Sequence, residues 1–289
     1  MKKYTYILIA LFLFFFSGVQ AQAPVIPVET KLDSLFARIV RSKDDDSKVL
    51  KNDSIRTIID SYVLSDSVMS HKFKTLRYLG QIKADDGSLK IINWNLALRD
   101  GSNRYFCYVI RKGDKGKPNK LYRFSGSDSE EAPATDKTYT LDEWYGGIYY
   151  SVQPFKAEGK TSYLVLGLNN NNVYVTRKII DVISFGKNDD IEFGKKCFEN
   201  KKSTVSRVVF EYSGEAVVSL RMLNPKTVIF DRLASIADDN SKSAVSMGAE
   251  YRFDGYSYKK GVWNFVSNVD ARNDKYVKKT NHKVVTSPY

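Results

Sequence analysis

The stretch VYVTRKIIDVISF, residues 173–185, carries a pattern that decides the fold class of this chain. A short apolar run of this kind, bounded by turn residues, predicts a buried β-strand. Asp181 interrupts the run, and we expect its carboxylate to face solvent, as a strand aspartate usually does. The centre of the stretch consists of four β-branched residues, a type that favours strands: Ile179, Ile180, Val182 and Ile183.

Short runs of the same type recur along most of the chain. Asp-Gly pairs at residues 86–87 and 100–101 separate the first three runs, and such pairs are a strong signal for hairpins. No helical pattern lies between the runs, which favours antiparallel pairing over βαβ units. We therefore predict an all-β fold of antiparallel meander sheets, sandwich-like or strongly curved. The expected strands cover residues 76–82, 89–98, 104–110, 148–152, 162–168, 173–185, 204–212, 216–222, 228–230, 249–253 and 262–266.

The pattern before the first strand is helical. Two sets of apolar residues recur at the spacing of one helix face, which predicts two short helices separated by the polar residues 44–47. We assign residues 22–70 to this helical segment, residues 71–270 to a β-rich domain and residues 271–289 to a basic tail. The two apolar sets are Leu32, Leu35, Phe36, Ile39 and Val40, and Ile55, Ile58, Ile59, Tyr62 and Val63.

The first 21 residues have the layout of a secretory signal peptide. Lys2 and Lys3 precede an apolar run at residues 6–16, and small residues at 17–21 fit cleavage before Gln22. The apolar run is too short to span a bilayer. We therefore expect residues 1–21 to be a cleaved signal peptide and the mature chain to be periplasmic.

The chain of 289 residues has 45 Lys and Arg against 33 Asp and Glu, a formal net charge of +12. A basic balance attracts polyanions, although a basic surface without a partner explains it equally simply. No run of five like charges occurs, and the export signal argues against nucleic acid. We expect an envelope protein or an anionic glycan as the partner, and no membrane-spanning segment in the mature chain.

Cys107 and Cys197 are the only cysteines. In an oxidising compartment they could form a disulfide, and the alternative is two buried free thiols that pack as small apolar side chains. The sequence leaves both alternatives open. Together with His71 and His282, far apart in the chain, they give no zinc spacing, so we expect no metal site.

We find no candidate catalytic residue in the sequence. His71 stands at the junction of helices and strands and His282 in the tail, and no Gly-x-Ser-x-Gly motif occurs. The glycines fit no phosphate-binding spacing, so no cofactor is expected. We interpret the chain as a non-catalytic binding or envelope-scaffold component. The alternative is a hydrolase that acts on envelope glycans or peptides.

An aromatic cluster around Gly146 and Gly147 is the one candidate ligand site. It consists of Trp144, Tyr145 and Tyr149. Tryptophan and tyrosine rings bind sugar faces by apolar contact, which would make this cluster a carbohydrate platform. The alternative is that the three rings fill the core of a sheet.

Several segments resemble a family of exported proteins of the Bacteroidetes whose function is uncharacterised. The likeness spans about residues 73–270. It implies export, a β-rich body and the periplasm, and it supplies no catalytic residues. One departure occurs at residues 168–172, Leu-Asn-Asn-Asn-Asn, where the family pattern has a hairpin tip with an acid. The similar segments are residues 73–80, 85–87, 89–95, 144–146, 164–167, 177–185, 207–212, 228–231, 256 and 260–263.

Overall fold

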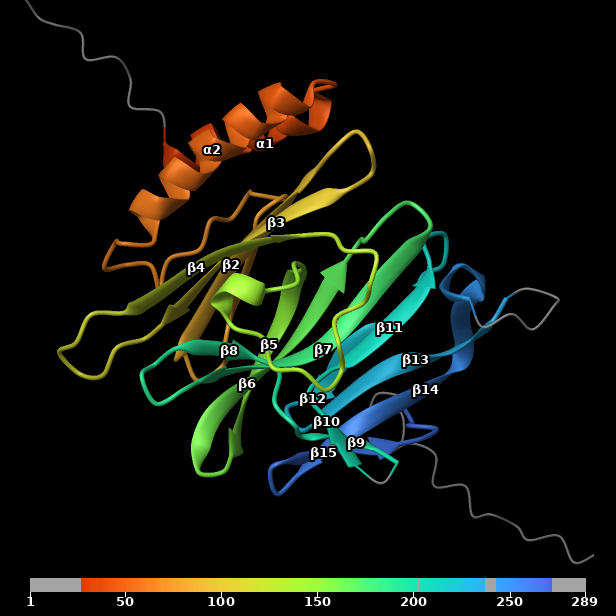
Figure 1. Ribbon diagram of the computed structural model, residues 1–289. Helices are drawn as coiled ribbons and strands as arrows, with labels where there is room; N and C mark the ends of the chain where they lie inside the picture. The colour runs from red at the N-terminus through yellow and green to blue at the C-terminus, as the bar shows by residue number, and fades with distance from the viewer. Residues whose placement is uncertain (1–26, 202, 237–242, 272–289) are drawn as a thin grey trace, which may run out of the picture.

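The computed structural model describes residues 27–201, 203–236 and 243–271. The expected signal peptide at 1–21 and all but the first residue of the expected tail at 271–289 lie outside the described residues. Within the described part, the chain consists mostly of β-strands with two α-helices, which confirms the predicted fold class. Figure 1 shows four layers, in the order of a helical pair and three sheets, which we name A, B and C.

The helical pair covers the outer face of sheet A (Figure 1). Asp44 caps the second helix, because its carboxylate accepts a hydrogen bond of 2.9 Å from the Ser47 N–H. The predicted apolar faces supply the contact: Phe36 packs edge-on against Trp94 of sheet A, with ring centroids 6.5 Å apart. No helix among the described residues is long and apolar enough to cross a membrane. The helices are α1 (Val28–Arg41) and α2 (Asp45–Tyr62).

Sheet A is a meander in the order β1-β2-β3-β4. The first expected Asp-Gly turn is present, with Gly87 at a φ of 71°, a region that glycine enters without strain. Strand β1 is short, and its pairing with β2 runs only from Gly80↔Asn93 to Lys83↔Lys90. The strands are β1 (Gly80–Lys83), β2 (Leu89–Ala97), β3 (Asn103–Arg111) and β4 (Lys120–Ser127).

Sheet B lies between sheets A and C and is buried on both faces (Figure 1). Its middle strand β7 contains the stretch that opened the sequence analysis. Successive strand residues point to opposite faces. Ile183 packs toward sheet A, whereas Ile180 and Val182 pack toward sheet C. The order is β11-β7-β6-β5, with β8 also on β7. The strands are β5 (Ile148–Ala157), β6 (Lys160–Asn169), β7 (Val175–Phe185), β8 (Ile191–Phe193) and β11 (Val208–Ser213).

Sheet C has the order β10-β9-β15-β14-β13-β12. One contact departs from the predicted antiparallel pairing, since β15 pairs with β9 in parallel at Trp263↔Phe198. Trp263 is fully buried and packs against Phe155 of sheet B, with ring centroids 5.6 Å apart. The strands are β9 (Phe198–Asn200), β10 (Ser203–Val205), β12 (Leu220–Asn224), β13 (Thr227–Ser235), β14 (Met247–Lys259) and β15 (Val262–Val266), and the 3₁₀ turns are η1 (Leu141–Glu143) and η2 (Ala244–Ser246).

Candidate functional site

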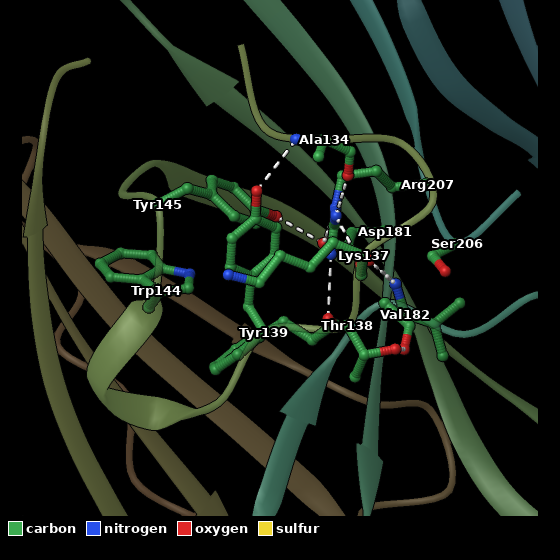
Figure 2. A network of polar contacts seen from close by, with 12 residues as sticks. Ala134, Lys137, Thr138, Tyr139, Trp144, Tyr145, Asp181, Val182, Ser206 and Arg207 are labelled. Atoms are coloured by element: carbon green, nitrogen blue, oxygen red, sulfur yellow. Dashed lines mark hydrogen bonds and ion pairs between the residues drawn. The ribbon is translucent and has the colours of Figure 1, made fainter. Parts of the chain in front are cut away.

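Asp181 is buried, and the expectation that it faces solvent is wrong. Its side chain points from β7 toward sheet A and accepts three hydrogen bonds (Figure 2). The donors are Nε of Arg207 at 3.0 Å, the Tyr145 hydroxyl at 2.7 Å and the Val182 N–H at 2.6 Å. Burial raises the pKa of Asp181, and the Arg207 cation and the Tyr145 hydroxyl act in the opposite direction. A carboxylate that is fully buried and already accepts three hydrogen bonds holds the structure together and is not accessible to a substrate.

Arg207 links Asp181 to the loop between β4 and β5 through hydrogen bonds at both ends of its guanidinium group (Figure 2). Its guanidinium donates to the backbone carbonyls of Ala134 and Lys137, and at 2.9 Å to that of Phe193. Gly194 passes so close, at a φ of 100°, that an added Cβ would lie 2.5 Å from a guanidinium nitrogen. Arg207 is therefore a buried anchor for the loop, and a side chain at 194 would displace it.

A second buried arginine fixes the start of the same loop. Arg177 of β7 is 2% exposed and donates at 2.6 Å to the carbonyls of both Ser129 and Glu130. Its Nε pairs with the Glu211 carboxylate at 2.8 Å. Carbonyls of the loop that follows β4 thus find their hydrogen-bond partners in two buried arginines, Arg177 in β7 and Arg207 directly before β11.

The predicted aromatic cluster is brought together, but inside the protein. Trp144 is 4% exposed and Tyr149 1% exposed, and both belong to the core between sheets A and B, whereas Tyr145 is partly exposed and packs against this core. The indole N–H of Trp144 donates to the Tyr149 hydroxyl at 2.9 Å, which lies 3.2 Å from the Tyr145 hydroxyl. Their ring faces are occupied by neighbouring side chains. The structure therefore favours the second interpretation, filling of the core, over a carbohydrate platform.

The two cysteines are buried free thiols, so the structure has the second alternative and not the disulfide. Cys107 lies in the core between sheets A and B, and Cys197 lies in the separate core between sheets B and C. Burial raises the pKa of both thiols, to about 12 for Cys197. Neither thiol is a candidate nucleophile in this state, because the thiolate is the reactive form.

A cavity of about 750 Å³ opens between α1, α2 and the connection that follows α2. His71 and Tyr62 line it, and the Tyr62 hydroxyl is 3.0 Å from Nδ1 of His71. Behind them, Lys90 of β2 donates to the carbonyls of Val68 and His71 at 2.8 and 2.6 Å and to the Tyr62 hydroxyl at 3.1 Å. Burial lowers the pKa of Lys90 to about 8. These three hydrogen bonds attach the connection after α2 to sheet A. A structural role therefore explains why Lys90 is buried.

A different cavity, of about 410 Å³, lies where turns of sheets A and B meet, and we call it the basic cavity. Arg111 at the end of β3, Lys112 after it and Lys160 at the start of β6 supply its cations. Ser88 and Tyr163 supply hydroxyls, which are 2.7 Å apart. No pattern in the sequence indicated this site, because its members come from four separate turns and strand ends.

The acids of the basic cavity are already paired. Asp189 binds Arg111 at 2.7 Å and also Lys120, and these hydrogen bonds lower the pKa of its carboxyl group. Asp114 lies 3.5 Å from Lys117. Among the described residues, neither Lys112 nor Lys160 has an ion pair or a hydrogen-bonded side-chain partner.

The third cation is held rigidly. The Arg111 guanidinium lies over the Phe185 ring, 4.5 Å from its centroid, while one of its nitrogens binds Asp189. A cation stacked on an aromatic ring and fixed by a carboxylate loses little freedom when it binds an anion. The basic cavity therefore combines one fixed cation with two unpaired lysines.

No family model, no curated protein and no solved structure matches this chain. The candidate site is thus argued from its own geometry.

Proposed function

We propose that this chain is an exported periplasmic binding component of the cell envelope, which holds an anionic glycan in the basic cavity. The observation that carries the proposal is the pair of unpaired lysines, Lys112 and Lys160, on a cavity whose acids are neutralised by other cations. The signal-like leader, the positive net charge and the likeness to exported Bacteroidetes proteins support export and an anionic partner.

The chemistry of the cavity suits a charged sugar. A uronate carboxylate or a sulfate ester would accept charge-assisted hydrogen bonds from the two lysines. The hydroxyls of Ser88 and Tyr163 suit sugar hydroxyls, which both donate and accept. A volume of about 410 Å³ accommodates one or two sugar rings rather than a long chain.

Binding is better supported here than hydrolysis. A glycosidase needs two carboxyl groups flanking the scissile bond, one of them with a raised pKa. In the basic cavity Asp189 has a lowered pKa and is held by cations. Asp181 has a raised pKa but is fully buried and already accepts three hydrogen bonds. Because neither Asp189 nor Asp181 is placed to act as the acid of a glycosidase, we favour ligand binding over hydrolysis.

The test is calorimetric titration of the purified protein with trigalacturonate and with its fully methyl-esterified form, which removes only the charges. We expect binding of the acid and loss of binding for the ester. The double variant K112Q/K160Q should bind the acid about tenfold more weakly or worse, because two charge-assisted contacts are removed.

The matched control is R41Q/K43Q, which removes two exposed cations from the helical layer, one at the last residue of α1 and one in the connection to α2. It should bind trigalacturonate as the native protein does. Equal binding of ester and acid, or equal loss in the two double variants, would contradict the proposed site.

A further inference from the structure

Strand β2 has no strand partner over its last four residues on the side of β1, and we call this side its free edge. Its pairing with β1 ends at Asn93, and β2 continues to Ala97. No other strand or bridge of the described residues pairs with residues 94–97 on that side. A sheet edge of this kind presents backbone donors and acceptors that a further strand can use.

The backbone groups of Asn95 point to this free edge. The Leu89 carbonyl accepts from the N–H of Ala84 at 2.9 Å, and the Ala97 carbonyl accepts from Nζ of Lys48 at 3.0 Å, so both point away from β3. Alternate residues of a strand direct their backbone groups to the same side. Asn95 is an even number of residues from both Leu89 and Ala97, so its N–H and C=O face the same side as theirs, which is the free edge.

A cavity of about 570 Å³ lies along the free edge. Trp94, Asn95 and Ala97 line it, so the cavity and the edge are one surface. Its remaining walls come from three layers and are largely apolar. The apolar lining outside β2 includes Phe36, Ile39, Leu79, Ile148 and Leu168.

An unsatisfied polar atom lies at this cavity. Asn93 also lines it and is fully buried, and its Oδ1 has no hydrogen-bond partner. Its Nδ2 donates to the Tyr149 carbonyl at 3.1 Å, which fixes the orientation of the amide. A Cβ built on Gly80 would lie 3.3 Å from this oxygen, and Gly80 lines the same cavity. Buried acceptors are normally paired, so the orphan oxygen points to a missing donor.

The rim of the cavity carries a cation without a partner. Arg77 lines the cavity, is exposed and makes no ion pair or hydrogen bond to another described residue. Beside it, Tyr78 is 50% exposed and also lines the cavity. A guanidinium in this position suits a carboxylate.

We propose that this cavity binds an extended peptide bearing a carboxylate, which adds as a strand to the free edge of β2 at residues 94–97 and places its acid on Arg77. Strand addition of this type takes affinity from main-chain hydrogen bonds and specificity from alternate side chains. The apolar lining receives every second side chain of the peptide. The partner is thus a protein segment, distinct from the glycan of the basic cavity.

The probe is a fluorescein-labelled, acetylated peptide TVTVDT, whose binding to the purified protein is followed by fluorescence anisotropy. Two derivatives are N-methylated at alternate amides, one on each edge of the extended peptide. Strand addition uses one edge only, so one derivative should lose about tenfold in affinity while the other binds as the parent does. No binding of the parent, or equal affinities of the two derivatives, would overturn the proposal.

A variant pair tests the carboxylate contact. R77Q should weaken binding of TVTVDT but leave the weaker binding of TVTVNT unchanged. The control R221Q removes an exposed arginine from β12 of sheet C and should change neither. Identical behaviour of R77Q and R221Q would overturn the assignment of Arg77. Dimers that the peptide dissociates, seen by sedimentation, would assign the edge to a second copy of this chain and overturn the proposal.

Discussion

Replacement of Asp181 by asparagine should destabilise the protein strongly, although the two side chains have the same shape. One carboxylate oxygen accepts from Arg207 at 3.0 Å and Tyr145 at 2.7 Å, and the other accepts from the Val182 N–H at 2.6 Å. An asparagine has only one oxygen. In either orientation its NH₂ group faces a donor, and the buried Arg207 loses its counter-charge.

The magnitude follows from the burial of the pair, since both side chains are 0% exposed. Removal of one partner of a buried ion pair costs about 3–5 kcal/mol. Arg207 keeps three carbonyl acceptors, at Ala134, Lys137 and Phe193. We therefore expect D181N to lose about 3 kcal/mol, the lower end of that range.

Equilibrium unfolding in urea, followed by tryptophan fluorescence, measures this loss. The matched control is E158Q, which neutralises the exposed partner of Lys195 in an ion pair of 2.7 Å. This control should leave the free energy of unfolding unchanged within error, because exposed pairs are screened by water. A D181N protein within about 1 kcal/mol of the native one would refute the reasoning, since that is the range of an ordinary substitution.

Three further predictions concern buried groups in the helical layer and the cores. Burial lowers the pKa of Lys90 from its ordinary 10.5 to about 8 in the folded protein, so between these values the unfolded state binds more protons and stability rises with pH. Native protein should therefore gain about 1–2 kcal/mol over K90M between pH 7.5 and 9.5 in urea unfolding; parallel pH profiles would contradict this. N52L removes the acceptor of the Trp94 indole N–H, a bond of 2.8 Å, and should cost about 1–3 kcal/mol by the same assay, whereas no loss would show that this buried bond is dispensable. Cys107 and Cys197 should not react with Ellman's reagent in the native state and both should react in urea; rapid labelling of the native protein would contradict their burial.

Local patterns predicted much of the fold. The spacing of Leu32, Phe36 and Ile39 predicted α1, and all three are buried. The Asp-Gly pairs predicted the hairpins of sheet A, and the run at residues 173–185 predicted a buried strand. These features depend on residues that are close together in the sequence, so they can be predicted from local patterns.

The stacking of the layers could not be predicted in the same way. No local pattern indicated that two buried arginines would hold the loop that follows the end of β4 at Ser127. Arg207 lies 26 residues from Asp181. An alternating pattern shows which face a residue takes but not what covers that face. The one available signal was Arg177 and Arg207 themselves, charged residues beside strands that are otherwise apolar.

The two cavities that we propose as binding sites were equally hidden. The basic cavity takes its cations from the end of β3, the residue after it and the start of β6. The free edge of β2 exists because β1 begins only at Gly80, opposite Asn93. Both depend on where strands end relative to one another across sheets. The sequence left two interpretations of Trp144, Tyr145 and Tyr149 open, a ligand site or a filled core, because aromatic residues of a core and of a binding surface have the same composition.

The most direct test of the proposed glycan site is to observe its lysines. Reductive ¹³C-methylation keeps the lysine charge and gives each side chain an NMR signal, which the single variants K112Q and K160Q assign by loss. On addition of trigalacturonate, the account predicts that the Lys112 and Lys160 signals shift while that of Lys43 in the helical layer does not. Unchanged signals of Lys112 and Lys160, with binding still detected, would contradict it.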